Sequence, residues 1–149
     1  MIYVTGDTHG NFERFRPEYF PEQAKLTKND IVIIAGDFGG VWFGDSRDDG
    51  SLDWLESLPF TLAFVDGNHE NFDALAAYPV DGYRFFTMGG AMSHDIRCRT
   101  EHISWWRQEL PSGEEYAETR QNLDRVGWEV NYIITHCAAT GTIRGRKHY

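Results

Sequence analysis

Four short apolar segments of this chain each end at side chains that can bind a metal ion. The segments are residues 2–5, 31–35, 61–65 and 132–135. The side chains after them are Asp7 with His9, Asp37, Asn68 with His69, and His136. In an open α/β sheet, parallel strands lie side by side and ligands bind beyond their carboxyl ends. The order of segments therefore predicts that these scattered oxygen and nitrogen donors converge, as a site for two divalent metals requires.

The length and composition are those of a single globular domain. The 149 residues include 41% hydrophobic ones, enough for a core. We find no linker, low-complexity tract or internal repeat, so a single domain is predicted over residues 1–149. The net charge of −9 disfavours a nucleic-acid partner bound through bulk charge. A small phosphorylated substrate is compatible with this charge, because bound cations would offset part of it.

The sequence favours a cytoplasmic protein without membrane association. The longest aliphatic run, residues 31–35, is far too short to cross a bilayer. The chain begins with a predicted strand and not with a basic segment and an apolar stretch, which disfavours a secretory signal. Cys98 and Cys137 make no disulfide framework, and Cys137 follows a candidate metal ligand. A reducing compartment is therefore expected.

Strands and helices are predicted to alternate in the first half of the chain. Pro17 and Pro21 break residues 11–28 into one or two short helices. Residues 31–35 are continuously aliphatic, which predicts a strand buried on both faces. Ser51 is expected to cap a short helix after an acidic loop, and a further short helix is expected over 71–77.

The second half is predicted to change in character. Residues 83–99 favour antiparallel strands joined at glycines, on which Asp95 and Arg99 would share a face and pair. Ser112 and Glu115 form a capping box that predicts a helix ending near Gly127. Together these patterns predict an α/β fold with a mixed sheet or with two sheets.

Each candidate ligand also has an ordinary structural explanation. Asp7-Thr8-His9 can grip one ion or form a surface turn, and Asp37 can bind metal or cap a turn. Because Asp37 follows the most buried strand, its carboxylate must be paired or metal-bound there, and its two oxygens can bridge two cations. Asn68 can offer a carbonyl oxygen or cap a helix, while His69 beside it is suited to proton transfer.

These motifs resemble those of a known family when taken together. The motifs are Gly6-Asp7-Thr8-His9-Gly10, Gly36-Asp37-Phe38-Gly39, Gly67-Asn68-His69-Glu70 and Thr135-His136. In this order they resemble the calcineurin-like metallophosphoesterases, over residues 1 to about 138. Residues 89–95 and 105–109 are similar to segments of a group of small bacterial members. The implied fold is an α/β sandwich of two mixed β-sheets flanked by helices.

The resemblance implies an activity and a role for each residue. It implies metal-dependent hydrolysis of a phosphomonoester or phosphodiester by a water that two metals activate. Asp7 and His9 would bind the first metal, Asp37 would bridge, and Asn68 and His136 would bind the second. His69 and Asp37 would be the catalytic residues, and His69 would either steady the transition state or protonate the leaving group. The donor types suit Mn, Fe, Zn or Ni. Arg84 and Arg99 are expected to have at most a minor substrate role.

The sequence also departs from this family. Its members continue past the position of His136 and supply a Gly-His-x-His motif, which this sequence lacks. We expect a sandwich without its last strands, with each metal site one ligand short and completed by water, another chain or His148. The alternative is a catalytically impaired metal- or phosphate-binding remnant that forms a homo-oligomer through the truncated sheet edge. A Rossmann-like nucleotide binder is disfavoured, because Gly6 and Gly10 lack the required glycine spacing.

Overall fold

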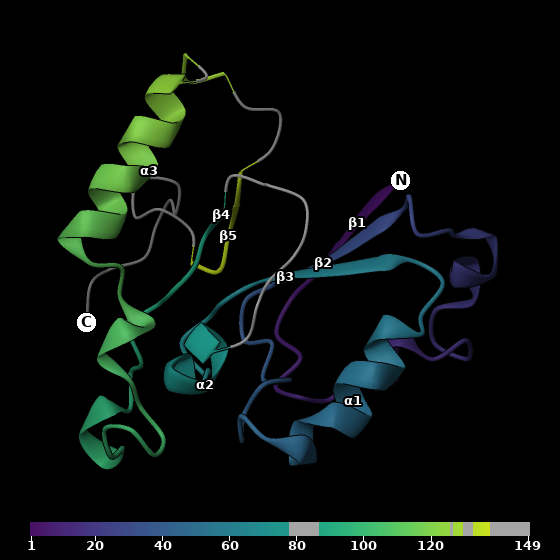
Figure 1. Ribbon diagram of the computed structural model, residues 1–149, viewed down its shortest axis with the longest axis horizontal. Coiled ribbons are helices and arrows are strands. Elements are labelled where there is room, and N and C mark those ends of the chain that lie inside the picture. The colour runs from purple at the N-terminus through teal and green to yellow at the C-terminus, as the bar shows by residue number, and fades with distance from the viewer. Residues whose placement is uncertain (78–86, 126, 130–132, 138–149) are drawn as a thin grey trace.

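A three-stranded parallel sheet forms the centre of the fold. The computed structural model describes residues 1–77, 87–125, 127–129 and 133–137. Strands β1 (Ile2–Thr5), β2 (Ile31–Ala35) and β3 (Thr61–Val65) lie in the order β1-β2-β3 (Figure 1). Ile2 pairs with Ile31, and Ile31 with Thr61. This register brings the carboxyl ends of the strands to one edge, and it confirms the three predicted strands.

Burial is deepest along β2, as its aliphatic sequence predicts. Val32, Ile33 and Ile34 are each at most 3% exposed. One face of the sheet packs against Leu55, Leu58 and a set of phenylalanines that includes Phe12, Phe15, Phe38 and Phe60. The rings of Phe38 and Phe64 stack with their centroids 4.2 Å apart. Each such side chain contributes roughly 1.5–3 kcal/mol by burial, so this cluster anchors the sheet edge at which Asp37 follows β2.

Helix α1 (Ser46–Glu56) begins earlier than the sequence predicts. The side chain of Asp45 caps it by accepting a hydrogen bond from the Arg47 N–H at 3.0 Å. Asp48 in its first turn accepts from the backbone N–H groups of Phe43 and Gly44. The predicted cap at Ser51 was therefore wrong, because Gly50 inside the helix hid the stronger signal at Asp45.

The remaining elements confirm some predictions and correct others. Residues 11–28 hold two short 3-10 helices, Glu13–Phe15 and Pro21–Lys25, and α2 spans Phe72–Ala77. The Ser112–Glu115 capping box is present at the start of α3 (Gly113–Arg125), since each residue's N–H donates to the other's side chain. Ile96–Cys98 is a 3-10 helix where a strand was predicted.

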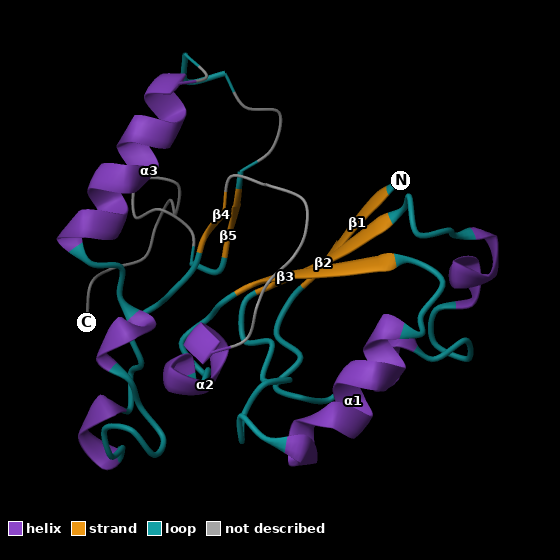
Figure 2. Cartoon of the chain, viewed as in Figure 1, coloured by secondary structure: helices purple, strands orange, loops and turns teal. Residues whose placement is uncertain are grey.

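The last two strands lie apart from the central sheet. β4 (Thr87–Met88) pairs with β5 (Ile134–Thr135) in parallel, and both lie beside α3, while α1 covers the central sheet (Figures 1 and 2). The predicted antiparallel strands at 83–86 lie outside the described residues. Among the residues described, all strand pairs are parallel. The α/β class is thus confirmed, while two mixed sheets are not shown.

None of the helices in the described part of the chain combines the length and the apolar character that crossing a membrane demands.

Candidate metal centre

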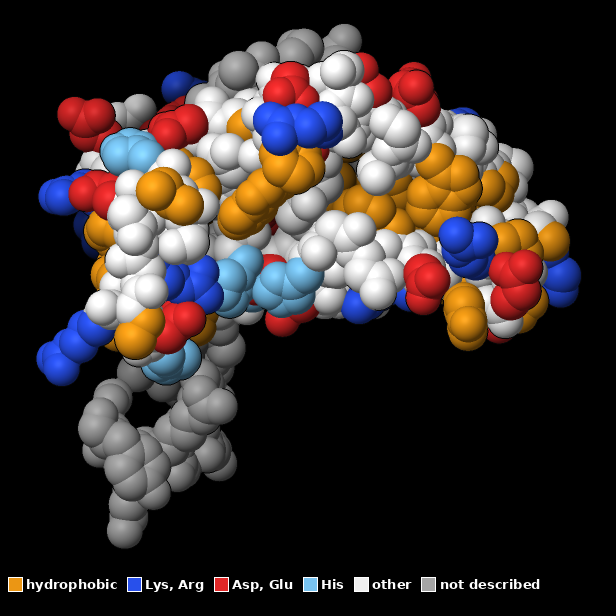
Figure 3. Space-filling model, turned by 90° about the horizontal axis from the view of Figure 1, so that it is seen from below, with side chains coloured by type: hydrophobic (Ala, Val, Ile, Leu, Met, Phe, Trp, Pro, Cys, Tyr) orange, Lys and Arg blue, Asp and Glu red, His pale blue; other side chains and the backbone are white. Residues whose placement is uncertain are grey.

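Two clusters of potential ligands meet at the carboxyl edge of the sheet. One contains His9, Asp37 and His69, and the other contains Asp7, Asp37 and His136. Within each cluster the ligand atoms lie within 4.8 Å of one another. Asp37 belongs to both. The space-filling view shows histidine side chains gathered on one face next to a basic side chain (Figure 3).

The carboxylate of Asp37 directs one oxygen toward each cluster. Oδ2 lies 2.9 Å from Nδ1 of His69 and 3.4 Å from Nε2 of His9. Oδ1 lies 3.7 Å from Nε2 of His136 and accepts a hydrogen bond from the His69 N–H at 2.9 Å. Burial to 3% exposure would raise the pKa of Asp37, but the hydrogen bonds from His69 and the charge of His136 hold it below its usual range. The carboxylate therefore remains ionised between the clusters.

The loop after β1 is bound directly to the loop after β2. The N–H groups of Thr8 and His9 both donate to the carbonyl of Asp37, at 2.9 and 2.8 Å. The buried hydroxyl of Thr8 donates to the carbonyl of Phe38 at 2.7 Å. His9 and Asp37 both have positive φ angles, 47° and 44°, a conformation that costs a non-glycine residue free energy. Surrounding hydrogen bonds hold this backbone in place and orient both side chains.

Two glycines make room for the ligands. A Cβ at Gly36, which has a φ of +103°, would overlap the imidazole of His136. A Cβ at Gly67 would overlap the carboxylate of Asp37. Glycine is therefore required at both positions by close approach, and at Gly36 also by backbone conformation.

Asn68 and His136 adjoin each other on the second cluster. Oδ1 of Asn68 lies 3.1 Å from Nε2 of His136. Nδ1 of His136 lies 3.6 Å from Oδ1 of Asp7 and 3.3 Å from the carbonyl of Ala35. β5 thus delivers His136 to the central sheet edge although it does not pair with that sheet.

Sequence reasoning missed Glu70 as part of the site. Its carboxylate is fully buried and accepts hydrogen bonds from the N–H groups of Phe38 at 2.6 Å and Gly39 at 3.0 Å. Burial raises the pKa of Glu70 to about 7, although these hydrogen bonds oppose the shift. The only available signal was its position next to His69, which indicated a favourable helix-dipole contact instead of a link to the Asp37 loop.

Arg99 also lies at the centre, although sequence reasoning gave it a minor role. Its Nη2 contacts Nε2 of His69. Asp95 accepts from its Nε at 2.7 Å, and the carbonyl of Ser104 accepts from its Nη1 at 2.9 Å. The predicted Asp95–Arg99 pair is present, but its two residues flank the 3-10 helix Ile96–Cys98 and do not lie on a strand. A guanidinium is thus held beside His69.

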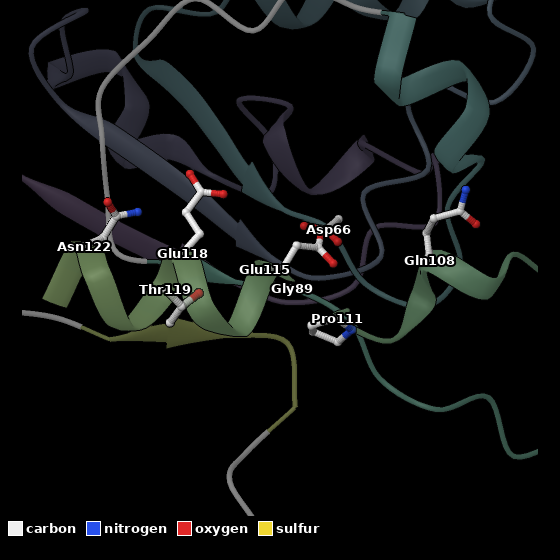
Figure 4. A pocket seen from close by; sticks show the side chains of 8 residues that line it. All are labelled: Asp66, Gly89, Gln108, Pro111, Glu115, Glu118, Thr119 and Asn122. Carbon is white, nitrogen blue, oxygen red and sulfur yellow. The ribbon is translucent and has the colours of Figure 1, made fainter. Parts of the chain in front are cut away.

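A separate cavity of about 260 Å³ lies between the end of β3 and α3 (Figure 4). Side chains from α3 reach into it, together with Asp66 and Gln108. Burial raises the pKa of Asp66. None of its described lining residues belongs to the two clusters, so we keep this cavity apart from the metal centre.

The residues present fit divalent metals. The donors are carboxylate oxygens, an amide oxygen and imidazole nitrogens, the set that suits Mn, Fe, Zn or Ni. All six predicted site residues lie at this edge: Asp7, His9, Asp37, Asn68, His69 and His136. Their grouping differs from the predicted assignment, because His69 shares a cluster with His9, while Asp7 lies with His136. The role of each residue stays a prediction.

Comparison with known proteins agrees with this arrangement. A search of curated proteins and a search of solved structures each found no match. A model of the calcineurin-like phosphoesterase family matches residues 1–147. Members of this family are generally metal-dependent phosphoesterases. The chain therefore belongs to the calcineurin-like phosphoesterase family.

Proposed function

We propose that this protein hydrolyses a small phosphomonoester or phosphodiester in a metal-dependent reaction. The observation that carries the proposal is the buried Asp37 carboxylate, with one oxygen on each of two His/Asp clusters. The assignment that the family resemblance implies gives Asp7 and His9 to one metal with Asp37, and Asn68 and His136 to the other. In the structure Asp7 lies with His136 instead, so His9 would bind on the Oδ2 side of Asp37, and Asp7, Asn68 and His136 on the Oδ1 side. Two divalent metals bound there would supply Lewis acidity and lower the pKa of a water molecule.

His69 is the candidate for proton transfer. Because a carboxylate only accepts hydrogen bonds, the 2.9 Å contact with Asp37 places a proton on Nδ1 of His69. Nε2 accepts from Arg99 in the structure, because a guanidinium only donates. In our proposal the leaving oxygen of the substrate replaces this contact, and a proton carried on Nε2 would then stabilise that oxygen as its bond to phosphorus breaks.

Arg99 is the candidate for binding the phosphoryl group. Its guanidinium is fixed by Asp95 and Ser104, so little conformational freedom is lost when it meets a phosphate oxygen. Its charge would also favour an anionic substrate over a neutral one. The substrate class we propose is therefore a small phosphate ester, with Arg99 beside the ester that His69 protonates.

The strands β4 and β5 are candidates for a second sheet. We infer that the chain adopts the two-sheet sandwich of its family, with β4 and β5 as part of the second sheet. An experimental structure in which further strands pair with β4 or β5 would support this. Strands added to β1 or β3 alone would contradict it.

Turnover of aryl phosphates tests the proposed reaction. Protein freed of metal and then loaded with Mn²⁺ is mixed with p-nitrophenyl phosphate or bis-p-nitrophenyl phosphate. We expect the wild-type protein to hydrolyse one of these esters. Asp37→Asn should lose both the hydrolysis and the bound metal, whereas His69→Ala should lose the hydrolysis and keep the metal. Metal binding without turnover by the wild-type chain would contradict hydrolysis and favour a metal-binding remnant.

A further inference from the structure

Asn68 is joined to two buried residues that do not themselves reach the metal clusters. Nδ2 of Asn68 donates to Oγ of Ser93 at 3.0 Å. Oγ of Ser93 donates to Oε2 of Glu109 at 2.7 Å, and the N–H of Ser93 donates to Oε1 at 3.0 Å. Ser93 is 3% exposed and Glu109 is 1% exposed. Water therefore does not compete for these hydrogen bonds.

We propose that Glu109 and Ser93 are positioning residues that fix the side-chain amide of Asn68 with its carbonyl oxygen toward the metal centre. This inference rests on the proposed function in one respect, namely that a metal binds at this edge. The proposal also gives a role to residues 89–95 and 105–109, the two segments that resemble small bacterial members of the family and that contain none of the candidate metal ligands.

The direction of the hydrogen bonds follows from the chemistry of the three groups. A carboxylate has only acceptors, and both oxygens of Glu109 face Ser93. The hydroxyl proton of Ser93 is therefore committed to Glu109, and its lone pairs are left to accept. The group of Asn68 that faces Ser93 must then be the NH₂, which leaves Oδ1 on the side of His136. Only this orientation of the amide satisfies both Ser93 and Glu109.

A reversed amide would be costly at the metal. The NH₂ of Asn68 would face a cation and could not bind it, because an amide nitrogen donates and offers no lone pair. Partners of ligands outside the metal's own shell typically change metal affinity by about 10–100-fold when they are replaced. Glu109 and Ser93 therefore act on the metal through Asn68 alone.

Glu109→Gln tests the direction of the hydrogen bonds with little change in shape. The N–H of Ser93 can only donate, so the amide oxygen of the new side chain must face it. The NH₂ then donates to Oγ of Ser93, and the hydroxyl proton is released toward Asn68, which reverses its amide. We expect Mn²⁺ affinity at one of two sites to fall about 10–100-fold, measured by calorimetric titration of metal-free protein.

Asn68→Asp provides a rescue that a merely structural role would not produce. A carboxylate presents an oxygen on both sides. In the wild-type background it would oppose the lone pairs of Ser93, whereas in Glu109→Gln it would accept the released hydroxyl proton. The gain in Mn²⁺ affinity from Asn68→Asp should therefore be larger in the Glu109→Gln background than in the wild-type background. An equal or smaller gain in the folded double variant would overturn the proposal.

Ser93→Thr and Ser93→Val form a matched pair for the case in which Glu109→Gln does not fold. Both add the same bulk, and only Ser93→Thr keeps a hydroxyl. We expect the hydroxyl variant to bind Mn²⁺ at least about tenfold more tightly. Equal affinities in two folded variants would overturn the proposal. No step requires turnover, so a wild-type chain that binds Mn²⁺ without hydrolysing aryl phosphates refutes only the proposed function.

Discussion

At Glu70, a single carboxylate joins the third motif to the loop that carries Asp37. It is fully buried and accepts from two backbone N–H groups, those of Phe38 and Gly39. The N–H of Phe38 is buried and that of Gly39 is partly buried, so the loss of the carboxylate would remove a hydrogen-bond partner that water does not readily replace. Glu70 thus fixes the backbone that orients Asp37, although it does not belong to either ligand cluster.

Glu70→Ala is expected to lower the free energy of unfolding of the metal-free protein by about 3 kcal/mol, because each unsatisfied N–H costs roughly 1–3 kcal/mol. The free energy of unfolding of Glu70→Gln should lie between those of the wild-type protein and Glu70→Ala, since glutamine keeps one acceptor oxygen. Urea denaturation with a chelator measures both. The exposed Glu22→Ala is the control and should change stability by less than about 0.5 kcal/mol. A loss as small as that in Glu70→Ala would contradict the assigned contacts.

Arg99→Ala is expected to raise KM for an aryl phosphate by about tenfold, since it removes a charge-assisted contact to the phosphoryl oxygens. Arg99→Lys should recover part of this, because an ammonium keeps the charge and loses the planar geometry. Arg97→Ala, at an exposed residue of the 3-10 helix that precedes Arg99, is the matched control. Unchanged KM in Arg99→Ala, at unchanged metal content, would argue against the assigned contact with substrate.

Residue by residue, the convergence of the candidate ligands could be predicted, whereas the residues that support them could not. Asp37 was identifiable because a carboxylate directly after a fully aliphatic strand needs a charged or metal partner. Glu70 and Glu109 were not identifiable, because each binds groups that are distant along the chain. The partners of Glu70 lie 31 or more residues away, and the partner of Glu109 lies 16 residues away. Such pairs follow from how loops meet in space, and neither periodicity nor local turn chemistry encodes that.

At the scale of elements, α1 shows how a local signal can be misread. Its cap is Asp45, and the helix continues through Gly50, which lies between this cap and the predicted one at Ser51. Sequence reasoning moved the start to Ser51, because glycine disfavours helix interiors. Contacts of Asp48 with the N–H groups of Phe43 and Gly44 add stability to the first turn that propensity alone does not include.

Helix α2 is held to the following segment by Asp73. This carboxylate lies 2.9 Å from Nδ1 of His102 and accepts from Nε1 of the buried Trp106 at 2.9 Å. The hydrogen bonds from His102 and Trp106 lower the pKa of Asp73. A carboxyl with a lowered pKa stabilises the fold above its usual value of about 3.9, and this stability is lost as the pH falls through the folded pKa.

Asp73→Asn should therefore be less stable than the wild-type protein at about pH 5.5, with the difference shrinking as the pH falls below the usual carboxyl pKa of about 3.9. The variant keeps an acceptor for Trp106 and loses the charge that faces His102. Denaturant midpoints of the two proteins across this range provide the measurement. A difference that stays constant with pH would show that the charge of Asp73 has no part in joining α2 to residues 102–106.

For the whole molecule, the candidate metal centre brings together residues that follow strands of both sheets. His136 follows β5, which does not pair with the central sheet, yet it reaches Asp7 and Asp37. A ligand that binds only the folded state stabilises it by mass action, by about 2.7 kcal/mol at a hundredfold excess over Kd. Bound metal should therefore stabilise the association of the β4–β5 pair with the central sheet.

Addition of Mn²⁺ to metal-free protein is expected to raise Tm, and the rise should increase with Mn²⁺ concentration. Mg²⁺ should act more weakly, because imidazole ligands suit it poorly. Asp37→Asn should abolish most of the rise, since Asp37 lies in both clusters. Differential scanning calorimetry measures each case. An equal rise with Mn²⁺ in Asp37→Asn would place the bound ions elsewhere on the protein.

The in-register pairing of β1, β2 and β3 has a consequence for which changes in length the protein can tolerate. Residues inserted at 16–19, the exposed connection between the 3-10 helices Glu13–Phe15 and Pro21–Lys25, only lengthen a surface connection, so we expect the ligand positions to survive them. One residue inserted inside β2 would advance Asp37 by about 3.3 Å and turn it to the opposite side of the sheet. Relatives of this chain should therefore vary in the lengths of their connections and keep their strand lengths constant.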